Sequence, residues 1–561
     1  MPKAHPISQR RHLSLPRPLI PMTRATTRQQ CPGDIEDVVV VGAGLSGLSA
    51  GLRLLASGKH VTIVEADDIV GGRCRTETLE SAHGPFEADT GASVLTMSDL
   101  INVAIAAVGI NPYELQLPDG RRWSVRKLSP AYTGQFASGR YLRMFADRDA
   151  MHKELIRFAQ DKYSCAADDF RIRKLIEGYD QHRQWAANMF TLSYEHFLAS
   201  DFDGLLDLVS TPAATSSLGR LLAAGAFKHL GPTTHKHIAD AEVERMLTFQ
   251  ALYAGEAPAK ALGVYSVISH MDCTMGVYYP EYSIGDAAEF MALAFQKAGG
   301  ELRLGTQVTG LELDGEHVRT VHIAGCEPLH PDAVISTVDI GITANWVGKS
   351  SALRKARFSP SAVVLHGTIP TKVSDHWHHS QHHTLSFGEQ WSETFRRITA
   401  KAGKGQLMMD PCLLITRPGQ SAAHRIRTHQ GVCYEPLSIL APTPNLKSAP
   451  VDWNAIQEGY IQELLLELEN RGFTGLVDNF SIARVDTPQT YAEKYHYGDG
   501  SPFSLAHNFR QTGPFRPRNY PAFGIDNLVL AGCGTTPGVG IPTVLLSGAL
   551  AARRITGGGV R

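Results

Sequence analysis

The sequence predicts an α/β protein in which a doubly wound parallel sheet is assembled from separated segments and a second, α+β domain is interleaved with it. Three observations lead to this prediction: a strand–glycine turn–helix–strand unit near the N-terminus, core-type strands that recur late in the chain, and long helix-rich blocks between them. A chain of 561 residues also exceeds what one hydrophobic core usually supports.

The first unit is read from three adjacent segments. Residues 37–41 (DVVVV) form a continuous apolar, β-branched run, which is typical of a strand buried on both faces. A helical pattern follows from Ser46 to about Ser57, with leucines on one face, and residues 60–65 (HVTIVE) form a second strand. A strand, turn, helix and strand in this order open a doubly wound sheet.

The remaining elements follow in order along the chain. Helical periodicity dominates residues 95–275, for example around 151–163 and 241–254. We then expect a strand at 276–280, a helix at 285–299, strands at 301–305 and 307–313, a core strand at 332–337, a helix at 453–471, a strand at 527–531 and a helix at 541–555. The charge-free run 527–552 is long enough to cross a bilayer, but its glycines and prolines would break a membrane helix. We therefore interpret it as strand, loop and helix.

A glycine-rich turn joins the first strand to the first helix. Gly42-Ala43-Gly44-Leu45-Ser46-Gly47 has the G-x-G-x-x-G spacing, in which the first glycine permits the tight turn, the second admits a diphosphate and the third allows close helix–strand packing. The helix N-terminus offers free N–H groups and partial positive charge to that anion. Glu65 ends the second strand, where an acidic side chain accepts hydrogen bonds from ribose hydroxyls and favours FAD or NAD over NADP. The motif predicts a Rossmann-type domain.

A second glycine motif follows Glu65. In EADDIVGGRCRT, Gly71 and Gly72 give backbone access and Arg73 supplies a forked donor for phosphate. The run resembles the extended fingerprint of the FAD-dependent amine oxidase and carotenoid desaturase superfamily, which implies FAD as the cofactor. Residues 86–96 (FEADTGASVLT) resemble a flavin-lining segment of that superfamily, with Ala92-Ser93 in place of its Pro-Thr.

The third motif lies at the C-terminus, in NLVLAGCGTTPGVGIPTVLLSGALAARRI (527–555). It closely resembles the C-terminal block of phytoene desaturases of the bacterial and fungal type. The glycine loop lets backbone pass beside the isoalloxazine ring, and the helix that begins near Ile541 directs its positive end there. Segments 245–281, 440–453 and 484–519 also resemble this family, so the resemblance covers most of the chain from residue 37 to 555.

The resemblance implies an FAD-dependent carotenoid desaturase that transfers hydride to flavin and converts phytoene, a C40-type polyene hydrocarbon, to lycopene or a related conjugated polyene. The cofactor-binding positions that it implies are Gly42, Gly44, Leu45, Ser46, Gly47, Glu65, Gly72, Arg73, Val308, Gly532, Gly540 and Ile541. One departure is Glu281-Tyr282-Ser283, where the family commonly has a basic residue and two glycines. Larger side chains in a substrate-facing loop would alter chain-length preference, or they would only fill a gap.

The predicted domains follow the order of these segments. Residues 1–34 form a basic extension, and the FAD-binding domain comprises residues 35–95, 285–345 and 500–561. The substrate domain, which faces a membrane, comprises residues 96–284 and 346–499. The extension is either a disordered tail, with Met22 as an alternative start, or a transit peptide. We expect a cytoplasmic protein on the membrane periphery, or an organellar one if the extension is a transit peptide.

Composition excludes several other classes of protein. The formal net charge of −1 gives no field that attracts nucleic acid, and the eight cysteines are scattered without a disulfide framework, which indicates a reducing compartment. Five histidines lie in HWHHSQHH (376–383) without interleaved carboxylate or cysteine, so we expect a surface loop and no metal site. Cys74 and Cys533 lie in cofactor motifs, and we expect both to serve packing.

Several questions stay open in the sequence. Asp272, Tyr278, Tyr279 and Glu281 lie on the segment expected near the substrate, but none is assigned as the proton acceptor. The apolar run 202–227 is either helical core or a membrane-dipping entrance. The electron acceptor is a quinone or oxygen. The alternative functions are a carotenoid isomerase, a ketolase or oxidase, a saturase, and a non-enzymatic prenyl-lipid escort protein.

Overall fold

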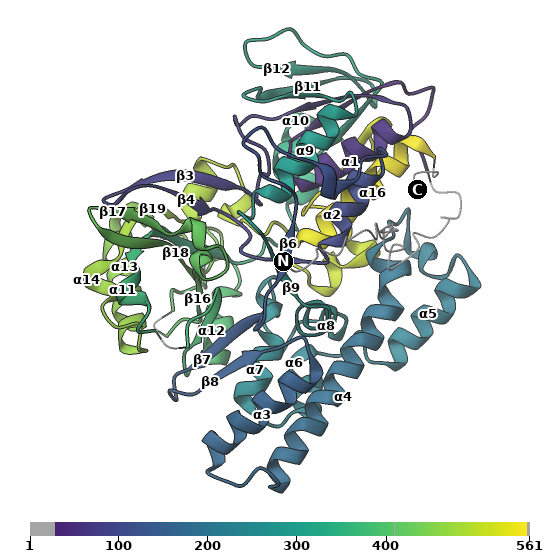
Figure 1. The fold of residues 1–561 in the computed structure, drawn as a ribbon. Coiled ribbons are helices and arrows are strands. Elements are labelled where there is room, and N and C mark those ends of the chain that lie inside the picture. Colours follow the sequence, from purple (N-terminus) through teal and green to yellow (C-terminus); the bar gives the residue numbers. More distant parts are fainter. Residues whose placement is uncertain (1–28, 378, 409, 558–561) are drawn as a thin grey trace, which may run out of the picture.

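A computed structural model describes residues 29–377, 379–408 and 410–557 of the protein (Figure 1). Its first sheet is fully parallel and has the order β10-β2-β1-β13-β20. The strands are β1 (Asp37–Val41), β2 (His60–Val64), β10 (Glu301–Arg303), β13 (Ala333–Ser336) and β20 (Leu528–Leu530). Strands from the beginning, middle and end of the chain thus pair in one sheet, as the sequence predicts for a doubly wound domain.

Both faces of this sheet are buried. Val38 and Val40 of β1 belong to one core cluster, while Val39 and Val41 belong to another. On the first face lie α1 (Leu45–Ala56), α9 (Asp286–Lys297) and α16 (Ile541–Thr556), and on the second lie α10 (Ile340–Trp346) and the hairpin of β11 (Val308–Asp314) and β12 (His317–Ile323). Because alternate side chains of a strand point to opposite faces, a strand covered on both sides must be apolar throughout.

The second domain is built around a mixed sheet with the order β19-β14-β18-β16-β15-β7-β8, to which β17 adds by pairing with β18. Its strands are β7 (Tyr132–Phe136), β8 (Tyr141–Met144), β14 (Ser361–Pro370), β15 (His383–Phe387), β16 (Leu413–Thr416), β17 (Arg427–His429), β18 (Val432–Thr443) and β19 (Ser481–Asp486). Helix α13 (Trp453–Asn470) packs its apolar side into a core with β14, β16 and β18.

A helical block continues this domain away from the parallel sheet (Figure 1). It contains α3 (Arg148–Tyr163), α4 (Phe170–Ser193), α5 (Pro212–Ala223), α6 (Leu230–His237), α7 (Ala241–Thr248) and α8 (Ser266–His270). After α8 the chain enters β9 (Val277–Pro280), which pairs with β5 (Leu95–Thr96) and β6 (Val125–Lys127) between the two domains. Smaller elements are β3 (Thr76–Ser81), β4 (Gly84–Asp89), α2 (Asp99–Ala106), α11 (Thr371–Ser374), α12 (Trp391–Ile398), α14 (Leu476–Asn479) and α15 (Pro488–Glu493).

Two long apolar runs of the sequence have different environments in the structure. The charge-free run 527–552 forms β20, a loop and most of α16, as expected, and no helix among the described residues is long and apolar enough to cross a bilayer. In the run 202–227, by contrast, Leu205, Leu206 and Leu222 are exposed, so its interpretation as helical core is wrong for these side chains.

Of the predicted N-terminal extension, the structure describes residues 29–34, and residues 1–28 lie outside the described part. Cys31 is buried, and its N–H donates to the carbonyl of Arg554.

Helix α16 is fixed along its length by contacts with distant segments. At Gly548 its backbone lies so close to α1 that an added Cβ would be 2.2 Å from the carbonyl oxygen of Ser46. Ser49 Oγ of α1 donates to the carbonyl of Leu545 at 2.6 Å. Near its C-terminal end, buried Arg554 forms ion pairs of 2.6 Å with both Asp201 and Asp203. Helix α16 therefore connects the parallel sheet to the segment that leads into α5.

Two helical glycines make a matched test of this packing. Gly548→Ala should destabilise the fold by about 1–3 kcal/mol, because the new methyl group meets backbone of α1 that has no room to move. Gly219→Ala, on the exposed side of α5 with open space around it, should instead stabilise the fold by about 0.5–1 kcal/mol. Chemical denaturation of both variants measures the difference, and equal stability would show that the two helices are not in close contact.

Candidate functional site

The three glycines of the first motif have different roles in the structure. Gly42 has a φ of +105°, and an added Cβ would lie 2.4 Å from Thr337 Oγ1, so it shapes the turn. An added Cβ on Gly47 would lie 2.0 Å from the carbonyl oxygen of Gly42, so it closes the helix onto the strand. Around Gly44 the nearest atom to such a Cβ is 3.9 Å away. The space in front of Gly44 is therefore free for a ligand at the N-terminus of α1.

Glu65 lies directly beside this turn at the end of β2. Its carboxylate accepts the N–H of Ala43 at 2.7 Å and that of Asp67 at 3.1 Å. Burial raises the pKa of this carboxyl. The backbone carbonyl of Glu65 accepts the N–H of Thr306, two residues before Val308. Thus Val308, at the start of β11, lies two residues from a direct backbone contact with Glu65. Glu65 is the residue that we expect to bind the ribose.

The second motif lies against the first. Gly71 N–H donates to the carbonyl of Ala43 at 3.0 Å, and an added Cβ on Gly72 would lie 3.6 Å from the Cα of Gly44. The guanidinium of Arg73 stacks on the ring of Tyr497 at 3.9 Å. Its Nε and Nη2 are buried but have no hydrogen-bond partner among the described residues. Nη2 lies 3.7 Å from Asp339 Oδ2 in an ion pair without a hydrogen bond. Donors that lack hydrogen-bond partners beside an open glycine turn fit a diphosphate, which Arg binds through such a fork.

The flavin-lining segment that the resemblance implies runs next to Arg73. Ala92 N–H donates to the carbonyl of Arg73 at 3.1 Å, and Thr90 N–H donates to that of Arg75. Ser93 is used within the protein, because its carbonyl faces His382 Nε2 at 3.2 Å and its hydroxyl accepts that of Thr416. The replacement of Pro-Thr by Ala92-Ser93 is therefore accommodated by contacts with the second domain.

The C-terminal loop reaches the same place from the other end of the chain. An added Cβ on Gly532 would lie 3.3 Å from Ser46 Oγ, and the N–H of Gly532 donates to Ser547 Oγ of α16. Gly540, with a φ of +117°, precedes the first residue of α16, Ile541. The loop at Gly532 therefore lies beside the N-terminus of α1, and α16, which follows this loop, begins with free N–H groups and positive partial charge.

A buried arginine that the motifs did not single out holds this loop in shape. Arg516 Nε donates to the carbonyl of Thr535 at 2.8 Å, and Nη2 donates to that of Cys533 at 2.5 Å. Burial lowers the pKa of Arg516 to about 10. The signal in the sequence was FRPRN (515–519), but nothing there indicated which loop the arginine would bind.

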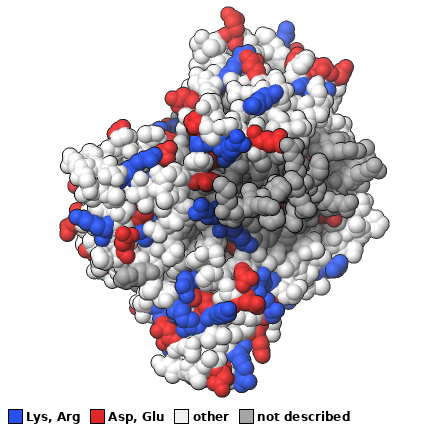
Figure 2. All heavy atoms as spheres, in the orientation of Figure 1, with Lys and Arg blue, Asp and Glu red and all other residues white. Residues whose placement is uncertain are grey.

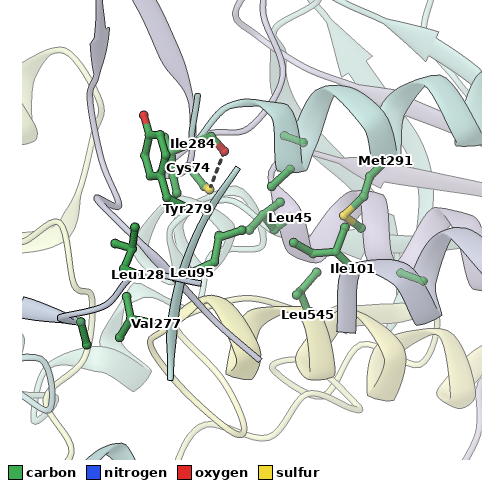
Figure 3. Close-up of a cluster of buried hydrophobic side chains, with 14 of the residues drawn as sticks. Leu45, Cys74, Leu95, Ile101, Leu128, Val277, Tyr279, Ile284, Met291 and Leu545 are labelled. Atoms are coloured by element: carbon green, nitrogen blue, oxygen red, sulfur yellow. Dashed lines mark hydrogen bonds between the residues drawn. The ribbon is translucent and has the colours of Figure 1, made fainter. Parts of the chain in front are cut away.

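The side chains around β5 and β9 form a buried apolar cluster (Figure 3). Leu45 of α1, Leu95 of β5, Ile101 of α2 and Leu545 of α16 are all buried in one cluster. Cys74 lies in this cluster, with Sγ 3.7 Å from the carbonyl of Ile284, and burial raises the pKa of its thiol to about 12. Packing is thus the role that its surroundings support.

Of the four candidate proton acceptors, three have other roles. Tyr279 is buried, donates to Asp89 at 2.5 Å and accepts from Arg425 at 2.9 Å. Glu281 is exposed and accepts the hydroxyl of Ser124 at 2.8 Å. Tyr278 is half-buried near Lys127, whose Nζ lies 5.9 Å from the ring. Asp272 differs from them, because burial raises the pKa of its carboxyl to about 7.

The histidine-rich stretch corrects one expectation. His376 and His379 are exposed, but His382 and His383 are buried at the start of β15, so the stretch is not wholly a surface loop. His382 packs on the ring of Tyr279 at 4.5 Å, and burial lowers its pKa to about 4. The continuation into β15 explains the burial, and His378 lies outside the described residues. Among those residues no cluster of His, Cys, Asp or Glu could hold a metal ion.

Gly44→Val tests the assignment of the first turn. An added Cβ on Gly44 meets no atom closer than 3.9 Å, so the variant should keep its secondary structure, but valine would occupy the space for the diphosphate. We expect its FAD content, measured by flavin absorbance of the purified protein, to fall to background. Gly204→Val is the control, since Gly204 is also extended and uncrowded but lies outside the motifs. Normal FAD content in Gly44→Val would contradict the assignment.

Comparison with known proteins agrees with this geometry. The family model described as flavin-containing amine oxidoreductase matches residues 45–406 and 486–556. A phytoene dehydrogenase of Streptomyces griseus is 41% identical over 94% of this chain and 96% of its own length. A neurosporene-forming phytoene desaturase of Rhodobacter capsulatus is 28% identical over 92% of this chain and 93% of its own.

Solved structures share the fold. An oxidoreductase from Methanosarcina mazei has a TM-score of 0.55 and 13% identity, and the match covers 91% of this chain and 99% of that one. Cyclohexylamine oxidase from Brevibacterium oxydans has a TM-score of 0.52 and 15% identity, with 93% and 99% covered. The chain thus belongs to the flavin-containing amine oxidoreductase family, as an FAD-dependent oxidoreductase.

Proposed function

We propose that the protein desaturates phytoene or a closely related C40 polyene and gives lycopene or another conjugated polyene. The single observation that supports this most is that the Gly44 turn, the Gly71-Gly72 loop and the loop at Gly532 meet beside a buried apolar cluster that includes Leu45 and Leu95. A hydrocarbon substrate offers no polar group, so such a site must hold it by shape and by burial. The phytoene-related names of the relatives point to the same substrate class.

When bound, FAD supplies a two-electron acceptor for the hydride that desaturation removes. The chain's own residues bind and shield it. Arg73, Glu65 and the N–H groups after Gly44 provide donors and acceptors for its diphosphate and ribose, and the N-terminus of α16 favours negative charge on the ring. Leu45, Leu95 and Leu545 exclude water from the apolar cluster nearby, which keeps these electrostatic interactions strong.

We also propose that the protein docks on a membrane through one apolar surface. Seven of the eleven large apolar side chains that the described residues expose belong to it: Leu205, Leu206, Val209, Leu222, Phe227, Phe509 and Phe515. The rings of Phe227 and Phe509 lie 5.8 Å apart, and those of Phe509 and Phe515 lie 5.4 Å apart, so the two segments form one surface. Exposed apolar patches of this kind are typical of membrane or partner contacts.

The charges around the apolar surface favour anionic lipid. Arg220, Lys228, Arg510 and Arg518 are exposed beside it, while Asp207 is the only acidic residue of segments 204–228 and 508–518 and is partly buried. Elsewhere blue and red side chains are interspersed over the face in view (Figure 2), which gives no broad basic field for nucleic acid. Attraction of Lys and Arg to anionic headgroups adds to the burial of apolar side chains.

Two further proposals concern the surroundings of the enzyme. We propose that it works at the cytoplasmic side of a membrane, or inside an organelle if residues 1–34 act as a transit peptide. We propose a quinone or oxygen as the acceptor that reoxidises the flavin; a docked enzyme meets quinone in the same bilayer that holds the substrate.

The membrane proposal has a matched test. Leu206→Ser combined with Phe509→Ser should weaken binding to vesicles of phosphatidylglycerol and phosphatidylcholine about tenfold or more, because each lost side chain removes about 1.5–3 kcal/mol of burial. Leu466→Ser changes another exposed leucine, on α13 and away from this surface, and should bind as the wild type does. Co-sedimentation measures all three, and unchanged binding of the double variant would exclude this surface.

The catalytic proposal is tested by co-expression in a host that accumulates phytoene, with pigments analysed by chromatography and absorbance. We expect coloured polyenes with extended conjugation, and the band positions count the double bonds introduced. Phytoene left unchanged by protein that is shown to contain FAD would contradict the proposal. That result would favour a relative that acts on a later polyene, such as an isomerase, ketolase or saturase.

A further inference from the structure

Asp272 is a carboxyl group enclosed by uncharged side chains at the junction of the two domains. It lies in a π-helical turn (Met271–Met275) between α8 and β9. Such turns are frequent at functional sites, because they displace a side chain from the regular helical position. Here Asp272 is brought next to Gln250, and it remains partly exposed although protein surrounds it.

No cation compensates this carboxyl among the described residues. Within the described part of the chain it accepts one hydrogen bond of 3.4 Å, donated by Gln250 Nε2, which also donates to Tyr132 at 3.2 Å. The neighbouring titratable groups are Tyr132 of β7, Tyr253 and Cys273, and burial raises the pKa of each, so they remain neutral near pH 7. A partly buried carboxyl that has no cation partner destabilises a fold at neutral pH, and such a group is a candidate for a role in the chemistry.

Packing contacts connect Asp272 to the C-terminal flavin loop. Met271 belongs to the same buried cluster as Leu546 of α16. Tyr253, which interacts electrostatically with Asp272, packs against Phe503 with ring centroids 6.4 Å apart. The residue after Phe503, Ser504, has its Oγ 3.6 Å from where a Cβ on Gly534 would lie. Two aromatic side chains therefore separate Asp272 from the loop.

We propose that Asp272 accepts the proton that desaturation removes from the substrate, which rests on the function proposed above. Two hydrogens leave adjacent carbons: one leaves as hydride, with two electrons, to the flavin, and the other leaves as a proton to an oxygen of Asp272. The electron pair of the second C–H bond becomes the new double bond, so the substrate is oxidised and the flavin is reduced. A carboxylate in apolar surroundings suits this step, because a general base is most effective when its pKa lies near the pH at which the enzyme works.

The pKa of Asp272, which burial raises to about 7, sets the expected pH dependence. The base must be ionised to act, so the wild-type rate should rise as the pH is raised through about 7 and then level off. Burial raises the pKa of Tyr132, Tyr253 and Cys273, so these groups do not titrate in this range. The residual rate of Asp272→Asn should lack this rise.

The experiment compares Asp272→Asn and Asp272→Glu with the wild type, all loaded with FAD and supplied with phytoene in vesicles. Asp272→Asn should contain as much FAD but react about 100-fold more slowly or worse, the loss usual for a general base. Asp272→Glu should recover most of the rate. Asp161→Asn makes the same substitution at an exposed site on α3 and should match the wild type.

A second measurement does not depend on turnover. A folded-state pKa raised above the unfolded value means that the wild type loses stability as the pH rises from about 4 to about 7, because the folded protein holds its proton more tightly. Asp272→Asn lacks this loss, so its melting temperature should exceed that of the wild type at pH 8, and the gap should close toward pH 4.

The outcomes separate the two proposals. Equal turnover of Asp272→Asn and the wild type would overturn the role of Asp272 and leave the desaturase function intact. No gap in melting temperature at pH 8 would overturn the placement of an unpaired carboxyl at this turn. A wild type that holds FAD but leaves phytoene unchanged would overturn the proposed function, and the proposed role of Asp272 with it.

Discussion

The structure depends on one place where three stretches of backbone approach without side chains between them. The turn at Gly44, the loop at Gly71 and Gly72, and the loop at Gly532 come from residues far apart in the chain, yet each contacts the N-terminus of α1. Side chains at these positions would clash with backbone or fill the space for the cofactor. This requirement explains why glycine occurs in three separate motifs, and why the parallel sheet must include strands from both ends of the chain.

Local features of the fold could be predicted from the sequence, because their causes are local. The run DVVVV is apolar at every position, since β1 is covered on both faces, and the spacing of Gly42, Gly44 and Gly47 reflects one turn and one helix start. The elements around them were therefore predicted to within a few residues. Hydrophobic periodicity and turn residues depend on residues that are close in the sequence, and the same residues determine whether these segments form a strand, a turn or a helix.

Long-range contacts could not be predicted in this way. Nothing near Arg516 in the sequence indicates that it binds the carbonyls of Cys533 and Thr535, and nothing near Arg73 identifies Tyr497 as the ring beneath it. His382 and His383 were expected in a surface loop because they belong to a histidine-rich stretch without metal-ligand spacing, whereas the structure buries them. The exposed leucines near α5 show the opposite case, in which apolar character predicts burial that the fold does not provide.

The buried ion pairs of Arg554 have a consequence for where the reaction takes place. They join the end of α16 to Asp201 and Asp203, just before the segment that carries Leu205 and Leu206, while the start of the same helix follows the loop at Gly532. With the membrane docking and the flavin site proposed above, a single helix of 16 residues, about 24 Å long, would separate the lipid from the cofactor. The length of this helix would then set the distance that a polyene must move out of the bilayer before it reacts. The geometry of one helix would then determine which carbons along the hydrocarbon reach the ring.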